Sequence, residues 1–344
     1  MDDYKRLIQK AKINNDGAIL LGKYVACDGF DWNCSVGVVT HAHGNHIQGL
    51  ETSLGVYDQI LTTEPTREIL IAIKGDWLKF RMNLKPFPYR TQFKFIDEKI
   101  TLFPSKHMLG SAQVLIEDAD GTRIVYTGDF FIPNTEPLEA DVLVVDATCG
   151  DPSNVRKFTK KCAIDYLVSL TKKLIKRSPV NIISSQGKIQ EVMNYLVKEG
   201  IKAPFILQSK AYRVARVYEK YGISMGQCLH IEDPEAQEIL KKQEPHVAFF
   251  TFGTNIDKTP LIKVSGYISN WNSKRPFCKI SKEYWVVTIS NHADFKGTLE
   301  YITRSKPKLV ITDNHRSFGK AILLARKVRK KFGINAIALP QRVY

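Results

Sequence analysis

The sequence lacks several features that mark membrane and secreted proteins. It has no run of about 18 apolar residues, so we expect no helix that crosses a bilayer. The first residues, Met-Asp-Asp-Tyr-Lys-Arg, lead into no apolar segment, so we expect no secretory signal peptide. The six cysteines form no CxxC pair, which argues against a zinc ribbon and favours unpaired thiols in a reduced cytoplasm.

Internal repeats and low-complexity tracts are also missing, which argues against a solenoid or a fibrous protein. The chain has 344 residues, with ordinary hydrophobic and charged fractions of 44% and 25%. This length suits two domains, or one large domain that carries an insertion.

Positive charge is in surplus. Lys and Arg number 50 against 35 Asp and Glu, which gives a formal net charge of +15. Such a surplus favours a polyanionic partner such as nucleic acid, or an anionic membrane surface. A lysine-rich surface without such a role is the alternative.

The pattern of apolar residues changes near residue 150. Before it, short strand-like runs are separated by turn signals, with a helical stretch at 67–74; the runs are 18–21, 36–40, 93–96, 114–116, 123–127 and 142–145. After it, helical and buried-strand patterns alternate, which is typical of βαβ units and a parallel sheet. The last elements are helices over 295–304 and 320–332, with a strand at 308–312 between them.

Three of the eight histidines fall within six residues: His41, His43 and His46. They follow a strand-like run, and a turn at the end of a strand can aim several imidazoles at one point. Histidine is a good ligand for Zn²⁺, so the segment predicts a zinc site. A surface turn that happens to be rich in histidine is the alternative.

Other residues suited to metal or acid–base chemistry follow strand-like runs or lie in turns: His107, Asp129, Asp146, His292 and His315. Gly110 and small neighbours would let the backbone near His107 approach a crowded centre. A carboxylate at a strand end can bridge two hard cations, although taken alone each residue also fits an ordinary loop or Asp turn. The remaining histidines, His230 and His246, lack such settings, and we expect them to be structural.

In order and spacing, these residues resemble the motifs of nucleases of the β-CASP branch of the metallo-β-lactamase fold. The family motif His-x-His-x-Asp-His is similar to residues 41–46, His-Ala-His-Gly-Asn-His, so Asn45 stands where the family has Asp. The matches to the other motifs, in chain order, are Asp28, His107, Asp129, Asp146 and His292. The resemblance covers nearly the whole chain. Within this branch, the sequence is most similar to the compact ligase-associated exonucleases and mRNA 3′-end processing factor-like proteins.

The resemblance implies an α/β architecture. Residues 1–150 and 283–344 would form a metallo-β-lactamase αββα sandwich, and residues 151–282 would form an inserted β-CASP α/β cap domain. The site would lie in the cleft between them, and Asp28 would support the metal site.

The resemblance also implies the ligands. His41, His43 and His107 would hold one Zn²⁺. His46, Asn45 and His315 would hold a second cation, Zn²⁺ or Mn²⁺, and Asp129 would bridge the two. A neutral amide is a poorer ligand than a carboxylate, so the second site should be weaker, empty or differently filled. Asp313 competes with His315 as the last ligand.

The implied activity is that of a zinc-dependent nuclease, acting exonucleolytically on the phosphodiester bonds of DNA or RNA. A metal-bound hydroxide would attack phosphorus, and His292, positioned by Asp146, would protonate the leaving oxygen as the general acid. Asn45 motivates an alternative, a weakly active or non-catalytic nucleic-acid-binding protein. A lactonase or thioester hydrolase of the same fold is a third alternative. The Asp146–His292 pair and the net charge of +15 argue against it.

The expected partners are nucleic acid and proteins of a DNA repair or RNA processing complex, without a membrane. Basic side chains expected to contact nucleic acid are Lys188, Lys210, Arg213, Lys274 and Arg275, the last two after Trp271. For each of them, a solvated surface charge is the alternative.

Overall fold

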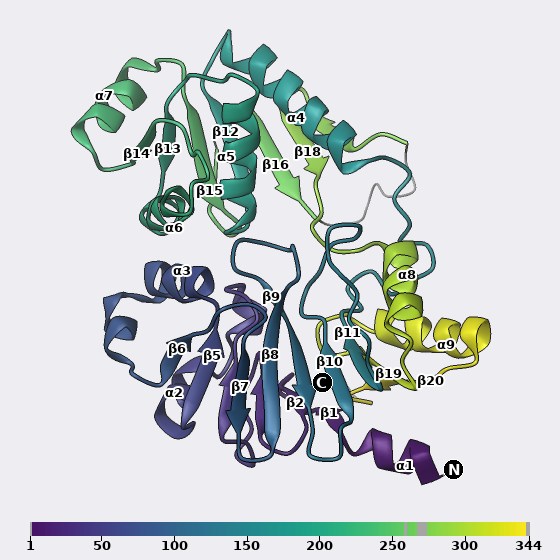
Figure 1. Cartoon of the computed structure of the whole chain (residues 1–344). Coiled ribbons are helices and arrows are strands. Elements are labelled where there is room, and N and C mark those ends of the chain that lie inside the picture. Colours follow the sequence, from purple (N-terminus) through teal and green to yellow (C-terminus); the bar gives the residue numbers. More distant parts are fainter. Residues whose placement is uncertain (1, 258–259, 267–273, 342–344) are drawn as a thin grey trace. The chain divides into compact units, whose positions relative to one another are not determined.

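The computed structural model describes residues 2–257, 260–266 and 274–341. The chain divides into two compact units (Figure 1). The first unit comprises residues 1–71, 75–155 and 291–344, and the second comprises residues 72–74 and 156–290.

Two sheets pack face to face in the first unit. One has the order β1-β2-β3-β4-β5-β6, with bounds Ala11–Ile13, Ile19–Leu21, Val25–Cys27, Val36–Val38, Gln59–Thr62 and Leu84–Pro86. The other has the order β20-β19-β11-β10-β9-β8-β7, with bounds Asn335–Leu339, Leu309–Asp313, Val142–Val145, Arg123–Tyr126, Ala112–Glu117, Glu98–Pro104 and Gln92–Phe95. Apolar side chains of both sheets, including Val36 and Ile124, form one buried core.

Helices cover the outer faces of this pair of sheets (Figure 1). They are α2 (Leu50–Val56), α3 (Glu64–Lys74), α8 (Phe295–Ser305) and α9 (Lys320–Phe332), while α1 (Asp2–Ile8) precedes β1. On the outer face of the second sheet, Leu143 packs with Leu299 of α8 and Leu324 of α9 in a second core. The layers follow the order αββα, and the expected fold class is confirmed.

Local sequence explains where these helices begin. Thr63 caps α3 by accepting a hydrogen bond from the Thr66 amide, and Asp294 caps α8 by accepting one from the Gly297 amide. Such caps satisfy amide groups that have no partner inside the helix. The cap of α8 holds the preceding loop, which contains His292, in a defined conformation.

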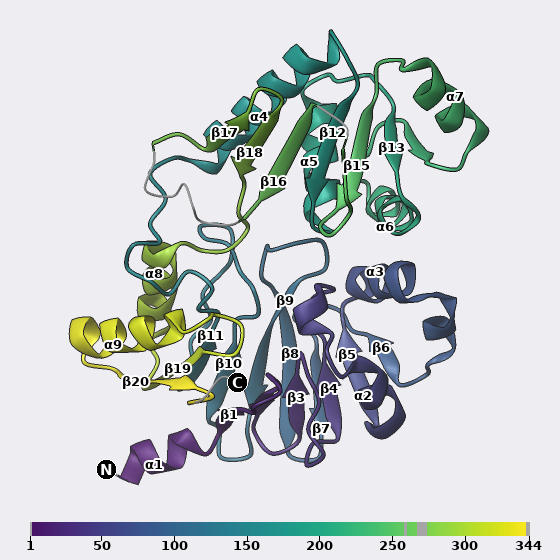
Figure 2. The ribbon, with the colours of Figure 1, turned by 180° about the vertical axis from the view of Figure 1, so that it is seen from behind.

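A largely parallel sheet forms the second unit (Figure 2). Its order is β14-β13-β15-β12-β16-β18-β17, with bounds Cys228–His230, Phe205–Leu207, Val247–Thr251, Val180–Ser184, Leu261–Ser265, Tyr284–Thr288 and Phe277–Ser281. Only the edge pair β17–β18 is antiparallel among the described strands of this sheet. The helices of this unit are α4 (Lys160–Ile175), α5 (Lys188–Lys198), α6 (Ser209–Lys220) and α7 (Pro234–Lys242).

Across the residues that the structure describes, no helix combines the length and apolar character needed to cross a membrane. No disulfide joins any of the six cysteines, all of which lie among the described residues.

Candidate metal centre

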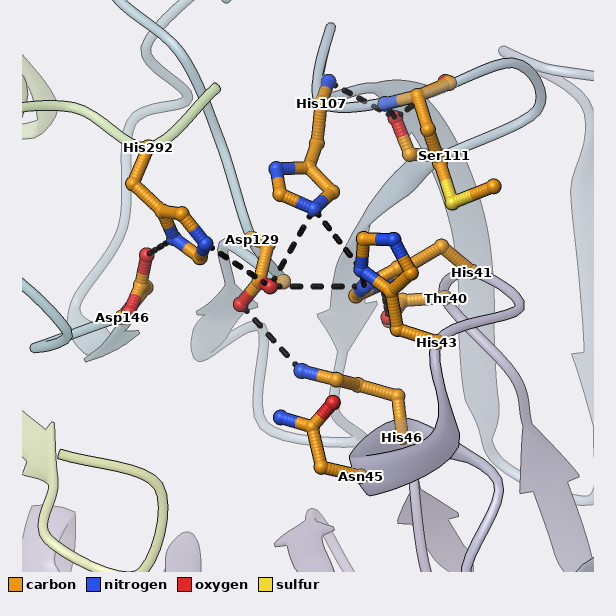
Figure 3. A network of polar contacts seen from close by, with 12 residues as sticks. Thr40, His41, His43, Asn45, His46, His107, Ser111, Asp129, Asp146 and His292 are labelled. Atoms are coloured by element: carbon orange, nitrogen blue, oxygen red, sulfur yellow. Dashed lines mark hydrogen bonds and ion pairs between the residues drawn. The ribbon is translucent and has the colours of Figure 1, made fainter. Parts of the chain in front are cut away.

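Several strands of the first unit end at one edge of the sandwich, and the loops that follow them bring the predicted site residues together (Figure 3). The histidine-rich segment follows β4 and includes a short 3₁₀ helix, η1 (Gly44–His46). His107 follows β8, Asp129 follows β10, and Asp146 directly follows β11. His292 lies in the loop ahead of α8.

Three imidazoles and one carboxylate converge most closely. The ligand atoms of His41, His43, His107 and Asp129 all lie within 4.8 Å of one another. The Nδ1 atom of His43 is 3.1 Å from Nε2 of His41 and 3.1 Å from Nε2 of His107. The Oδ2 atom of Asp129 is 3.5 Å from each of these Nε2 atoms. Three nitrogens and one oxygen therefore surround one point.

Hydrogen bonds on the outer side of the rings determine which nitrogen faces the centre. Nδ1–H of His107 donates to the carbonyl of Asn291 (3.0 Å), and Nδ1–H of His46 donates to Asp28 Oδ2 (2.7 Å). In the neutral tautomer, Nε2 of His107 then keeps its lone pair and directs it inward. Burial would lower the pKa of His46, but the charges of Asp129 and Asp28 outweigh it and raise the pKa to about 9, so its Nε2 carries a proton unless a cation displaces it. Such partners beyond the ligands fix tautomer and ring orientation in metal sites.

Asp28 makes hydrogen bonds on the outer side of this arrangement. Its carboxylate accepts hydrogen bonds from the Thr40 amide (2.8 Å), the Thr40 hydroxyl (2.6 Å) and the Tyr126 hydroxyl (3.1 Å). Because the Thr40 hydroxyl donates to Asp28, it accepts from Nδ1–H of His41 (3.1 Å). Asp28 has a φ of 53°, an unusual conformation for a residue with a side chain.

The donor set fits a divalent cation. Imidazole nitrogens with a carboxylate oxygen are the ligands that Zn²⁺ prefers in catalytic sites. Nε2 of His46 is buried and finds no hydrogen-bond partner among the described residues, although it lies 3.4 Å from Asp129 Oδ1. A buried lone pair without a donor is costly unless an ion or a proton satisfies it.

Burial and neighbouring charges together determine the protonation states of these groups. Burial lowers the pKa of His41 and, more strongly, that of His107, which keeps both imidazoles neutral and able to bind a cation. Burial would raise the pKa of Asp129, but the charges of His46 and His292 hold it well below its ordinary value. Asp129 is therefore an anion at the centre of a ring of imidazoles.

A carboxylate–imidazole pair lies beside this group. Nδ1–H of His292 donates to Asp146 Oδ2 (2.9 Å), and Nε2 of His292 lies 3.7 Å from Asp129 Oδ2. Asp146 is anchored in turn, since its amide donates to Thr127 Oγ1 (3.0 Å) and its Oδ1 accepts from the Thr148 amide (2.7 Å). Burial lowers the pKa of His292, yet Asp129 and Asp146 outweigh this effect and raise it.

The other predicted ligands lie outside these groups. Asn45 is exposed on η1 beside His46 (Figure 3). The ring of His315 lies against Gly17, where an added Cβ would come within 2.3 Å of it, and it borders a cavity of about 370 Å³. Asp313 accepts from the His315 amide (2.9 Å) and pairs with Arg316 (2.9 Å). Neither His315 nor Asp313 belongs to a potential metal-binding group among the described residues.

Sequence reasoning missed Arg316, whose side chain is only 5% exposed. Its guanidinium donates to the carbonyl of Asp28 (2.8 Å) and to the carbonyl of Asn45 (3.1 Å), in addition to its pair with Asp313. It therefore ties the loop after β19 to both segments that carry the centre. Its position directly after His315 was the one available signal.

The predicted nucleic-acid contacts have different surroundings. Lys188 is buried and pairs with Glu191 (2.6 Å), so the structure does not present it on the surface. Lys210 and Arg213 are exposed on α6, and Lys274 and Arg275 are exposed ahead of β17. Trp271 lies outside the described residues.

Comparison with known proteins gives several relatives, although no protein-family model matches the chain. A protein of Acidianus ambivalens named "Uncharacterized protein in lig 3′region" is 39% identical over 137 residues, which are 39% of this chain and 97% of that protein. A probable DNA ligase of Opitutus terrae is 25% identical over 88% of this chain and 28% of its own length. The transcription termination factor FttA of Pyrococcus horikoshii is 24% identical over 88% of this chain and 60% of its own length. The chain thus spans less than two thirds of the ligase and of the termination factor.

More distant matches point the same way. An RNase J-like protein of Methanocaldococcus jannaschii is 23% identical over 54% of this chain and 49% of its own length. Cleavage and polyadenylation specificity factor subunit 3 of Dictyostelium discoideum is 26% identical over 33% of this chain and 18% of its own length. The crystal structure of a protein of unknown function from Enterococcus faecalis V583 has a TM-score of 0.61, covers 90% of this chain and 80% of that chain, and is 15% identical. At that identity the structural likeness shows the fold alone.

Proposed function

This chain belongs to the β-CASP branch of the metallo-β-lactamase-fold proteins, and on this premise we propose that it is a metal-dependent nuclease. Its substrate would be the phosphodiester backbone of DNA or RNA. The observation that carries the proposal is the convergence of His41, His43, His107 and Asp129 with the Asp146–His292 pair beside them. Relatives named as a ligase, an RNase and a termination factor all concern nucleic acids by name, which supports the substrate class.

Zinc is the cation we propose for this centre, held by His41, His43, His107 and Asp129. When bound, such a cation lowers the pKa of a coordinated water and stabilises charge on phosphoryl oxygens. The protein contributes a preset geometry: the outer hydrogen bonds of His41 and His107 keep both Nε2 lone pairs directed inward.

A second cation would find a poorer set of ligands. Nε2 of His46 and Oδ1 of Asp129 face each other at 3.4 Å, but Asn45 offers only an exposed amide, and the ring of His315 lies against Gly17. We therefore propose one tightly held zinc ion, with a weaker second site at His46 that Mn²⁺ could also occupy.

His292 is the proposed general acid. Its Nδ1–H is engaged by Asp146, which orients the ring and favours the imidazolium, and its Nε2 lies 3.7 Å from the carboxylate of Asp129. A proton on Nε2 is thus placed beside the reacting centre, where it can pass to the leaving oxygen.

We propose exonucleolytic action in the cytoplasm, within a DNA repair or RNA processing complex. The lack of a disulfide among the six described cysteines supports the compartment, and the relatives named as a ligase and a termination factor support the two kinds of complex. The exposed side chains of Lys210, Arg213, Lys274 and Arg275 remain candidates for contact with the substrate backbone.

Incubation of the chain with end-labelled single- and double-stranded DNA and RNA, with added Zn²⁺, Mn²⁺ or Mg²⁺, tests the proposal. We expect metal-dependent cleavage whose products shorten from one end, and its loss in Asp129→Asn. Asp16→Asn, a change of the same kind at an exposed residue of the first unit, is the control. Cleavage by Asp129→Asn at the rate of the control would overturn the mechanism.

Asn45 favours one alternative function, a nucleic-acid-binding protein with little or no catalysis. The same assay separates the two, because tight binding without cleavage under every metal condition would support the alternative. Retained cleavage that chelation abolishes supports the nuclease.

A further inference from the structure

A groove of about 420 Å³ lies in the second unit, between α4 and the β17–β18 hairpin. Figure 2 shows α4 running beside these two strands. Four basic side chains line it: Lys173 and Arg177 from the helix side, and Lys279 and Lys282 from the hairpin side. None of these residues belongs to the contacts that the sequence predicts for nucleic acid.

The sequence explains why these side chains share one groove. Tyr166, Lys173 and Arg177 recur at helical spacing, so they lie along one face of α4 and its end. On β17, Phe277 and Lys279 alternate with Cys278 and point to the same side of the sheet. Tyr166 stacks on Phe277, with ring centroids 3.6 Å apart and planes 3° from parallel, which fixes the helix against the edge strand.

Charge in the groove is strongly one-sided. Glu283 is the acidic residue that lines it, and its carboxylate is already paired with Arg177 at 2.9 Å. Lys173, Lys279 and Lys282 are exposed. Cations gathered in this way repel one another, and a bound polyanion relieves the repulsion while releasing its own counterions.

Aromatic rings accompany the charges. Trp285 lines the groove, and the ammonium group of Lys279 lies 5.5 Å from its ring centroid. Tyr166, half-buried against Phe277, lines the same groove. Basic side chains that follow a backbone, interleaved with aromatic rings against which bases can pack, are the composition of sites for single-stranded nucleic acid.

We propose that this groove binds single-stranded nucleic acid, with Lys173, Lys279 and Lys282 contacting phosphates and Tyr166 contacting a base. The choice of nucleic acid over another polyanion rests on the proposed function. The metal-binding groups all belong to the first unit, so this is a holding site that takes no part in the chemistry.

Fluorescence anisotropy of a labelled oligothymidylate, titrated with the full chain in EDTA at several salt concentrations, tests the proposal without cleavage. The double variant Lys173→Gln/Lys279→Gln is compared with Lys202→Gln/Lys241→Gln, which removes two exposed lysines of the same unit that do not line the groove. We expect the groove variant to bind about tenfold more weakly and to lose about 1.4 from the slope of log K against log salt, at about 0.7 per contact. The control variant also loses two positive charges, but they do not line the groove, so its slope should stay close to that of the unmodified chain.

Tyr166→Leu tests the aromatic part. It should weaken binding while leaving the salt slope unchanged, because stacking involves no counterion release. Thermal unfolding of this variant shows whether the loss of the stack on Phe277 has disturbed the fold, and the lysine variants keep the proposal testable if it has.

Equal affinities and equal slopes in the groove and control variants would overturn the proposal, as would duplex DNA that competes as well as the single strand. If the groove instead binds an acidic protein, the groove and control variants should bind the oligothymidylate with equal affinities and equal slopes. Failure of the proposed function is distinct: groove-dependent binding without metal-dependent cleavage refutes the nuclease alone, and cleavage with unaltered binding refutes the groove alone.

Discussion

His292 carries the proton-transfer part of the proposed mechanism. Because Asp129 and Asp146 raise its pKa against the effect of burial, it stays protonated to higher pH than an ordinary histidine. A general acid acts in its protonated form, so cleavage should decline as pH rises through this raised pKa. Asp146→Asn removes one of the two raising charges and should move that decline to lower pH, and His292→Ala should lower kcat by about 10²–10⁴-fold.

Rate–pH profiles of the unmodified chain and both variants check this, with His230→Ala in the second unit as the control. A decline that Asp146→Asn leaves in place would remove Asp146 from the mechanism. The orientation of His292 would then depend on its loop alone.

Asn45 is the residue at which this chain departs from its family. Asn45→Asp would add a carboxylate next to His46, whose buried Nε2 has no hydrogen-bond partner among the described residues. Carboxylate binds divalent cations far better than a neutral amide, so we expect metal content to rise from about one towards two ions per chain. Elemental analysis after dialysis measures it, with the exposed Asn15→Asp as the control; unchanged content would show that the second site is closed by more than residue 45.

Single residues also show where sequence reasoning ends. His41, His107 and Asp129 were predictable because metal ligands combine a rare residue type with a fixed place after a strand, and the structure brings them together. Asn291 was not, since it acts on His107 through its backbone carbonyl and its amide, and a carbonyl is present at every position. Arg316 was missed for a related reason: two of its three acceptors, the carbonyls of Asp28 and Asn45, come from segments that only folding brings near it.

At the scale of the element, α5 begins with a largely buried ion-pair cluster. Lys188 and Lys160 both bind the carboxylate of Glu191, at 2.6 Å and 2.7 Å. Burial would raise the pKa of Glu191, but the two ammonium charges outweigh it and lower the pKa to about 2. Lys188, which sequence reasoning assigned to phosphate binding, is thus a structural residue of the second unit in this arrangement.

Glu191→Gln should destabilise the second unit by about 2–4 kcal/mol at neutral pH, because it leaves Lys188 buried without its counter-charge. The stabilisation by Glu191 is present above its ordinary pKa of 4.5 and is lost as pH falls towards 2. The variant should therefore lose less stability than the unmodified chain between these values. Urea unfolding across this pH range measures the difference, with the exposed Glu232→Gln as the control; parallel losses in both proteins would contradict the assignment.

Helices and strands were predicted correctly where they are long enough to show their periodicity in the sequence. The expected strand at 142–145 and the expected helix at 320–332 match β11 and α9 to the residue. The three-residue strands β1 and β3 went unpredicted, whereas the runs at 18–21 and 36–40 predicted the equally short β2 and β4. Three residues alone show a strand or helix period only weakly. The edge strand β17 was missed because three of its residues are exposed, so the sequence shows no apolar strand pattern there. Without this strand, the basic groove beside it could not be predicted either.

For the whole molecule, composition indicated the class of partner but not its place. A net charge of +15 says only that some surface favours polyanions. In the structure, the basic residues fall into three settings: exposed lysines, the largely buried cluster around Glu191, and the groove beside α4. These settings differ in whether a phosphate can reach the positive charge. Salt-dependent binding is therefore a property of a few side chains rather than of the total charge.

The two units have separate sheets and cores. Among the described residues, the groups positioned to bind a metal belong to one of these units, so metal removal should act on that unit only. A cation that binds only the folded first unit stabilises it by about 4 kcal/mol when its concentration is about a thousandfold above Kd. We expect calorimetry to show two unfolding transitions, of which Zn²⁺ raises one and EDTA lowers the same one. In Asp129→Ala neither addition should shift that transition, because the centre has lost its anion. A shift of both transitions, or a shift that survives Asp129→Ala, would mean that the cation acts elsewhere, and the assignment of His41, His43, His107 and Asp129 as its ligands would then be wrong.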